Sequence, residues 1–256
     1  MSSPATPRII VVIPSRYDSH RLPGKPLADI GGVPMIVRVA RQACRAQTVS
    51  EVVVATDDER IRSVVEKAGF RAVMTSRECP SGTDRIAEAV LAEPSAQIVV
   101  NVQGDEPLIP PAMIDQAVQP LLEDSAIDVG TLVKKIHAAE DLRNPSVIKV
   151  VLDRDQNCMY FSRSPIPYLR DSGDDEWIEK GTWYRHIGLY VFRKDFLSRF
   201  PTFSPTPLER MEKLEQLRIL EHGFHIRAVI TELESVAVDT PEDLERVRAM
   251  IASNPR

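Results

Sequence analysis

Three cations follow the first apolar run of the chain within one short loop. Residues 9–13 form a β-branched run typical of a buried strand, and the loop after it carries Arg16, Arg21 and Lys25. Ligands of open α/β sheets bind just beyond the carboxyl ends of the strands. Gly24 would let a main-chain N–H approach a phosphate, and three prolines stiffen the segment. We therefore expect a polyphosphate site here; the alternative is a solvated basic loop.

Asp105 lies at the carboxyl end of a second predicted strand. The uninterrupted apolar run 97–102 is followed by Gln103-Gly104-Asp105, and the next helix cannot begin much before Pro110 or Pro111. Asp105 is therefore too far upstream to cap that helix. We interpret it as a metal ligand, with a role in structuring its loop as the alternative.

Asp239, like Asp105, lies at the end of a predicted strand and is not needed to cap the helix that follows. Residues 235–239 are predicted to form a short strand, Thr240 is the expected helix cap, and Pro241 is the expected first helical residue. Mg²⁺ prefers hard oxygen ligands and takes one or two carboxylates together with phosphate oxygens and water. Asp105 and Asp239 could supply the carboxylates, although the sequence alone does not place them side by side.

Ser81 and Gly82 are expected at the start of a helix near 82–92. Ser81 with Asp84 three residues later approximates a capping box, which by itself explains the pair. Gly82 would also let a ligand approach the N-terminus of the helix. Both interpretations can hold together.

His186 lies on a strand predicted at 186–192. Alternation places it on one face with Gly188, Tyr190 and Phe192. A lone histidine can be a structural hydrogen-bonding group as readily as a catalytic one. Both possibilities stay open from the residues alone.

A helix predicted near 207–221 has a polar side with Glu209, Lys213 and Gln216. Its expected buried stripe consists of Leu208, Met211, Leu214 and Leu217. Most such polar helix faces are only solvated, so spacing alone assigns them no function.

Strands and helices alternate through the first half of the chain, which predicts βαβ units and a largely parallel sheet. Strands are expected at 9–13, 51–55, 71–74 and 97–102, with helices near 34–46, 58–68 and 82–92. The second half should add antiparallel strands. We expect strands there at 128–134, 147–152, 186–192, 225–230 and 235–239, and helices near 207–221 and 241–252.

The predicted fold class is α/β, with a Rossmann-like mixed and mostly parallel sheet flanked by helices and an added antiparallel lobe. We expect a single domain over 1–256, with a nucleotide-binding half at 8–125 and a second half at 126–256 for the other substrate and a subunit contact.

The composition limits the classes of partner and the cell compartment that we expect. The 256 residues carry a formal net charge of −5, which gives no general attraction to nucleic acid. Three cysteines fit neither a disulfide framework nor a zinc site, which favours a reducing cytoplasm. The first seven residues lack the apolar core of a signal peptide, and no apolar run is long enough for a membrane span.

A set of motifs occurs in order along the chain. They are Ile13-Pro14-Ser15-Arg16, Arg21-Leu-Pro-Gly-Lys25-Pro-Leu27, Asn101-Val-Gln-Gly-Asp105-Glu-Pro107, Tyr160-Phe-Ser-Arg163, Arg185-His186-Ile-Gly188-Leu-Tyr190, Leu214-Glu-Gln216-Leu-Arg218 and Val238-Asp239-Thr-Pro-Glu-Asp-Leu244. Together they resemble the 3-deoxy-manno-octulosonate (Kdo) cytidylyltransferases, also called CMP-Kdo synthetases. The resemblance covers nearly the whole chain after residue 7. Hexose-1-phosphate nucleotidyltransferases have a Gly-rich turn before the arginine, and sialate cytidylyltransferases usually have a Ser-Lys variant of Pro-Gly-Lys.

The resemblance implies an Mg²⁺-dependent enzyme that joins CTP to Kdo, releases pyrophosphate, works in lipopolysaccharide synthesis and forms a homodimer through the 125–205 half. It implies a catalytic set of Arg16, Arg21, Lys25, Asp105 and Asp239, the last two as metal ligands. Nucleotide contacts are implied for Pro14, Ser15, Arg16, Arg21, Lys25, Ser81, Gly82, Gln103 and Asp105. Sugar contacts are implied for Gln103, Arg163, Arg185, His186, Glu209 and Gln216, with Arg163 on the sugar carboxylate.

Two other functions stay open. One is a cytidylyltransferase for another 2-keto acid sugar, such as a sialic acid or an amino-substituted Kdo, because the residues that recognise the distal end of the sugar are not identified. The other is a catalytically inactive binding protein of the same fold. The choice of cytosine rests on the resemblance alone. Pro80, where some relatives have a polar residue, leaves its own contact open.

Overall fold

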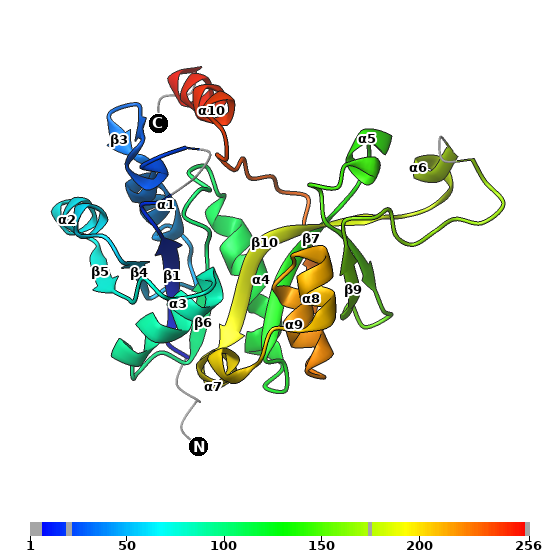
Figure 1. The fold of residues 1–256 in the computed structure, drawn as a ribbon, viewed down its shortest axis with the longest axis horizontal. Coiled ribbons are helices and arrows are strands. Elements are labelled where there is room, and N and C mark those ends of the chain that lie inside the picture. The colour runs from blue at the N-terminus through cyan, green and yellow to red at the C-terminus, as the bar shows by residue number, and fades with distance from the viewer. Residues whose placement is uncertain (1–6, 19–21, 174–175, 254–256) are drawn as a thin grey trace. The chain divides into compact units, whose positions relative to one another are not determined.

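The protein forms two compact units in a computed structural model that describes residues 7–18, 22–173 and 176–253 (Figure 1). Unit 1 comprises Met1–Asp115, Phe192–Pro201 and Glu234–Arg256; unit 2 comprises Gln116–Val191 and Thr202–Leu233. The C-terminal segment therefore belongs to the same unit as the N-terminal strands.

Unit 1 is built on a parallel sheet. Strand β1 (Ile9–Ser15) pairs in parallel with β4 (Glu51–Thr56) and β6 (Ile98–Asn101), and β4 pairs in parallel with β5 (Arg71–Met74). The β-branched runs of β1, β4 and β6 are almost completely buried, as expected for parallel strands covered on both faces. The register aligns the ends of β1 and β4, because Ser15 pairs with Thr56.

Helices connect these strands at nearly the predicted positions. They are α1 (Met35–Ala43), α2 (Glu59–Lys67) and α3 (Gly82–Ala89) with a 3₁₀ turn at Val90–Ala92. Unit 1 also contains the helix α7 (Lys194–Arg199). Asp58 and Ser81 cap α2 and α3 by accepting backbone N–H groups, and Gly69 after α2 has φ +85°. The predicted helix starts and stops are therefore confirmed here.

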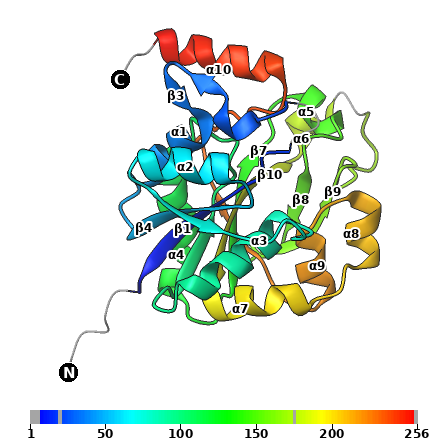
Figure 2. The same cartoon turned by 60° about the vertical axis from the view of Figure 1, so that its left-hand side comes forward.

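The last helix, α10 (Pro241–Ser253), packs on the short hairpin of β2 (Asp29–Ile30) and β3 (Val33–Pro34) (Figure 2). Their shared apolar core consists of Ile30, Met35, Val238, Leu244 and Val247. This packing anchors the segment that carries Asp239, since Val238 lies in that core.

Unit 2 contains β7 (Val129–Lys135), β8 (Lys149–Leu152), β9 (Cys158–Ser162), β11 (Arg227–Ile230) and most of β10 (Tyr184–Arg193). Strand β8 pairs antiparallel with β9 and β10, whereas β11 pairs in parallel with β7. The helices are α5 (Ala139–Arg143), α6 (Trp177–Lys180), α8 (Pro207–Glu212) and α9 (Gln216–Glu221). Helix α4 (Pro111–Glu123) carries the chain from unit 1 into unit 2, and it starts where the proline pair predicts.

The single helix predicted at 207–221 is wrong. Lys213 has a left-handed φ of 55°, which a continuous right-handed helix cannot contain, so α8 and α9 are separate. Arg163 supplies a reason, because its guanidinium bonds to the carbonyl oxygens of Glu212 and Lys213. Met211 was predicted to be buried but is exposed, whereas Leu214 and Leu217 are buried as expected.

The strand predicted at 235–239 is also wrong. None of the described strands pairs with this extended segment. Its Val238 N–H donates instead to the carbonyl of Asp105, at 2.9 Å. Several short elements were not predicted: β2, β3, β9, α5, α6 and α7.

The predicted fold class is confirmed: a mixed, mostly parallel α/β arrangement flanked by helices, with added antiparallel strands. Within the part of the chain that the structure describes, no helix combines the length and the apolar character needed to cross a membrane.

Candidate active site

Lys25 lies between the two predicted metal-binding aspartates. Its Nζ donates to Asp105 Oδ2 at 2.6 Å and to Asp239 Oδ1 at 3.1 Å. All three residues belong to unit 1. The sequence did not predict this contact, but it predicted each of the three as a site residue, and one cation reaches both carboxylates.

Two local structures bring these aspartates together. Asp105 lies in the turn after β6, and its carbonyl accepts the N–H of Val238. Asp239 directly precedes the cap of α10, where Thr240 Oγ1 accepts the N–H of Asp243 and the Asp243 carboxylate accepts the N–H of Thr240. The prediction that Thr240 caps this helix is confirmed.

The two carboxylates could hold a magnesium ion whose coordination shell a bound substrate completes. Asp105 and Asp239 offer hard oxygens, and both side chains are partly exposed. Among the described residues, no three His, Cys, Asp or Glu side chains form a metal-binding group. Two carboxylates suit Mg²⁺ if phosphate oxygens and water fill its other positions. The metal stays a prediction.

The loop predicted to bind phosphates, residues 16–25, follows β1, in which Pro14 and Ser15 are the last residues. Arg21 lies outside the described residues. Gly24 has φ +68°, and a Cβ there would lie 3.1 Å from the hydroxyl of Tyr17. Tyr17 in turn carries the Arg60 guanidinium over its ring, at 3.3 Å from the ring centre. Gly24 is therefore needed both for its backbone conformation and for the close approach of Tyr17.

Arg16 is held by the loop that precedes α3. Its Nη2 donates to the carbonyl of Cys79. Glu88 on α3 fixes that loop, because its carboxylate accepts the N–H of Ser76 at 2.9 Å and the thiol of Cys79 at 3.1 Å. Burial raises the pKa of the Cys79 thiol to about 11, with a further contribution from Glu88. Sequence reasoning did not identify Glu88, which gave no local signal on its helix.

Other predicted nucleotide-binding residues converge on Pro14. A Cβ on Gly82 would lie 3.7 Å from the Pro14 ring, and a Cβ on Gly104 would lie 3.0 Å from the Pro14 carbonyl. The start of α3, with Ser81 as its cap, therefore lies against the end of β1. The side chain of Gln103 donates to Asn101 Oδ1 at 3.2 Å. Small residues at these positions allow the close packing.

Arg163, in unit 2, is surrounded by main-chain carbonyls. Its Nε donates to Glu212 O at 2.6 Å and its Nη1 to Pro145 O at 2.9 Å. Glu212 accepts the N–H of Arg163 at 3.0 Å and the hydroxyl of Ser162 at 2.6 Å. Sequence reasoning missed Glu212, although the broken helix makes it the acidic partner of this segment.

Glu209 and Gln216 have different surroundings in unit 2. Glu209 completes a capping box with Thr206, and both of its carboxylate oxygens accept from Arg218, at 2.5 and 2.9 Å. Its pKa is lowered, because the bonds from Arg218 and Thr206 outweigh the opposing effect of burial. Gln216 is buried at the start of α9.

His186 is partly buried on β10. Burial lowers its pKa to about 3, so the ring is neutral at physiological pH. The ring packs against Phe161 and Tyr190, and its Nε2 lies 3.0 Å from Thr131 Oγ1. The contact with Tyr190 confirms the predicted shared face. Arg185 precedes His186 and lies opposite Lys149 of β8 in the antiparallel register of the two strands.

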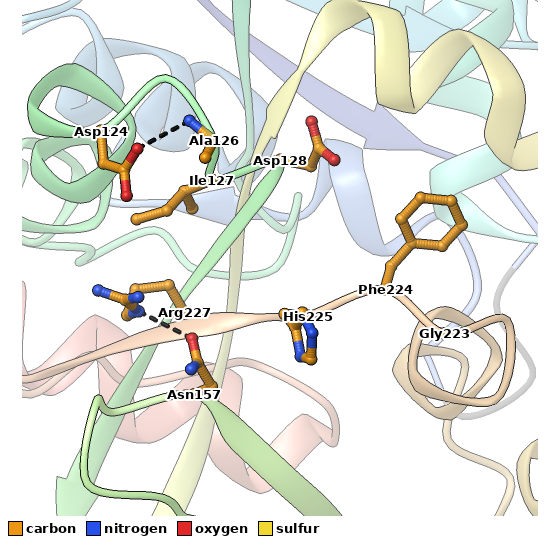
Figure 3. A pocket seen from close by; sticks show the side chains of 9 residues that line it. All are labelled: Asp124, Ala126, Ile127, Asp128, Asn157, Gly223, Phe224, His225 and Arg227. Atoms are coloured by element: carbon orange, nitrogen blue, oxygen red, sulfur yellow. Dashed lines mark hydrogen bonds between the residues drawn. The ribbon is translucent and has the colours of Figure 1, made fainter.

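Unit 2 also contains a pocket of about 230 Å³ (Figure 3). Its wall contains the carboxylates of Asp124 and Asp128, the guanidinium of Arg227 and the imidazole of His225. Arg227 Nε donates to Asn157 Oδ1 at 2.9 Å, and Asp124 accepts the N–H of Ala126 at 2.8 Å (Figure 3). None of the predicted site residues lines it.

The sequence profile of the cytidylyltransferases matches residues 10–232. The chain is 53% identical over 245 residues to the 3-deoxy-manno-octulosonate cytidylyltransferase of Geobacter metallireducens, covering 94% of this chain and 96% of that protein. It is 48% identical to the enzyme of the same name from Chloroherpeton thalassium, covering 96% of this chain and 98% of that protein.

The chain belongs to the 3-deoxy-manno-octulosonate cytidylyltransferase family. A solved structure of a CMP:2-keto-3-deoxy-manno-octonic acid synthetase, complexed with CTP, is 42% identical with a TM-score of 0.89 and covers 96% of this chain and 99% of its own. A cytidylyltransferase from Leptospira borgpetersenii is 17% identical with a TM-score of 0.66, covering 98% of this chain and 89% of its own, and shows the fold alone. The resemblance stated from the motifs is confirmed at the level of this cytidylyltransferase family.

Proposed function

We propose that the protein transfers CMP from CTP to the anomeric hydroxyl of Kdo, giving CMP-Kdo and pyrophosphate. The observation that carries the proposal is the group of Lys25, Asp105 and Asp239 in a chain about half identical to Kdo cytidylyltransferases. A nucleotidyl transfer needs cations on the triphosphate and oxygen ligands for a metal, and unit 1 provides both.

On the nucleotide side, Arg16, Arg21 and Lys25 hold the triphosphate and stabilise the departing pyrophosphate. Displacement at phosphorus is accelerated mainly by positioning and charge neutralisation, to which these cations contribute. A bound Mg²⁺, held by Asp105 and Asp239, would polarise the α-phosphate and lower the pKa of the attacking hydroxyl. Pro14, Ser15, Ser81, Gly82 and Gln103 shape the nucleotide pocket.

On the sugar side, we assign the carboxylate of Kdo to Arg163 and further contacts to Gln103, Arg185, His186, Glu209 and Gln216. Arg163 has five N–H donors, of which the main-chain bonds use three, so two remain for an incoming carboxylate. His186 acts as a neutral hydrogen-bonding group, because its ring is uncharged when buried. Glu209 supports the pocket through Arg218.

The protein is further proposed to work as a homodimer in the cytoplasm, in lipopolysaccharide synthesis. Exposed apolar side chains in the 125–205 half, Met159 at 61% and Tyr168 at 73%, support a subunit contact there. Light scattering in solution should give twice the mass of one chain. A monomeric mass at micromolar concentration would remove the dimer from the proposal.

The alternatives differ in substrate and are separated by one assay. Pyrophosphate release is measured with CTP and, in turn, Kdo, an amino-substituted Kdo and a sialic acid. We expect the highest kcat/KM with Kdo. A preference for one of the other sugars would support the alternative cytidylyltransferase, and no release with any sugar would support an inactive binding protein.

A further inference from the structure

The ammonium of Lys25 stands where a metal shared by Asp105 and Asp239 would stand. It contacts one oxygen of each carboxylate, at 2.6 and 3.1 Å. The Lys25 side chain is only 14% exposed, less than either aspartate, so it fills the space between the two carboxylates. One positive charge thereby offsets part of the repulsion between two negative ones.

We propose that Lys25 blocks the metal position in the nucleotide-free protein, so that the divalent cation enters together with CTP. This inference rests on the proposed function, because it takes Asp105 and Asp239 as the metal ligands. It adds a binding order that the proposed function does not contain: Lys25 releases the carboxylates when nucleotide phosphates offer its ammonium another anionic partner.

Geometry makes simultaneous occupancy unfavourable. Mg²⁺ binds carboxylate oxygens at about 2.1 Å, so an ion on the two oxygens that Lys25 contacts would compete for the same space. Two cations at such short range also repel each other, most strongly where the surroundings exclude water. Lys25 must therefore move before the metal can bind both aspartates.

The backbone around Lys25 is fixed, so the movement falls to the side chain. Lys25 N–H donates to Leu22 O at 3.0 Å, and Lys25 O accepts the N–H of Ala28 at 3.1 Å. The 3₁₀ turn Lys25–Leu27 starts at this residue. A lysine side chain carries a compact charge on a flexible four-carbon stem, so its ammonium can exchange one anionic partner for another.

The test measures Mn²⁺ binding to the full chain without nucleotide, by the loss of the free-ion electron paramagnetic resonance signal. The variants are Lys25→Met and Lys25→Gln, which remove the charge, with Lys67→Met on the exposed side of α2 as the matched control. We expect both Lys25 variants to bind Mn²⁺ at least about tenfold more tightly than the unaltered protein and the control. Adding Asp239→Asn to Lys25→Met should abolish the gain.

Mn²⁺ affinity of both Lys25 variants no higher than that of the unaltered protein would overturn the inference. The proposed function would survive that result if turnover still required Mg²⁺ and still failed in Asp105→Asn and Asp239→Asn. Metal-independent turnover, with no loss of activity in the aspartate variants, would instead remove the metal site itself and the inference with it.

Discussion

Asp105 and Asp239 lie far apart in the chain, yet one ammonium contacts both. Asp105→Asn and Asp239→Asn should each lower kcat by at least about 100-fold, because an amide is a poor Mg²⁺ ligand and a lost electrostatic group costs about 3 kcal/mol in barrier. Asp171→Asn is a matched control, since its side chain is exposed and asparagine tolerates the left-handed φ of 64°. Near-normal turnover of both site variants at millimolar Mg²⁺ would exclude them as metal ligands.

Arg163 has two possible roles that one substitution separates. Arg163→Lys should raise the KM for Kdo and lower kcat, because a point charge cannot replace a planar fork on a carboxylate, while CTP binding is retained. The same change should lower the melting temperature, since the bonds to Glu212 and Pro145 are lost. A lower melting temperature with unchanged Kdo kinetics would leave Arg163 with a purely structural role.

His186 should make the protein less stable in mild acid. Burial lowers its pKa from 6.5 to about 3. The unfolded chain therefore gains a proton below pH 6.5 that the folded chain excludes until about pH 3, and stability falls through that window as the pH is lowered. His186→Gln should remove a slope of up to about 1.4 kcal/mol per pH unit. Urea unfolding at several pH values measures it, and equal slopes in both proteins would contradict the buried neutral ring.

Local sequence signals decided most of the elements, and tertiary contacts decided the exceptions. Strand β1 and the starts of α3, α4 and α10 follow from a β-branched run, a cap and prolines. The break at Lys213 depends on Arg163, which is 50 residues away in the chain, and no window around the helix contains that information. The segment before Asp239 has strand-like composition, but the N–H of Val238 donates to the carbonyl of Asp105 and not to a neighbouring strand.

The break between α8 and α9 gives a test at the scale of the element. Lys213 has φ 55°, which costs a side chain about 1–2 kcal/mol and costs glycine almost nothing. Lys213→Gly should raise the free energy of unfolding by about 0.5–1 kcal/mol, because the greater freedom of unfolded glycine offsets part of the gain. Lys194→Gly, in the helix α7, should instead destabilise the protein. A loss of stability in Lys213→Gly would mean that the lysine side chain itself holds the break.

At the scale of the whole molecule, the order of the motifs predicted the family and the alternation of strands and helices predicted the fold class; the comparisons confirm both. The site could be predicted as a set of residue types at strand ends. Its contacts could not, because Lys25 meets Asp105 and Asp239 across 80 and 214 residues of chain. The return of α10 to unit 1 was also invisible in the sequence, since it depends on apolar packing against Ile30 and Met35.

The most direct test of the proposed function is the identity of the products. The protein is incubated with CTP, Kdo and Mg²⁺, and phosphorus nuclear magnetic resonance follows the reaction. We predict that the triphosphate signals of CTP disappear while pyrophosphate and one new phosphodiester signal, that of CMP-Kdo, grow in equal amounts. The phosphodiester should be absent without Kdo. Unchanged CTP, or free CMP with pyrophosphate and no phosphodiester, would contradict the transfer of CMP to Kdo.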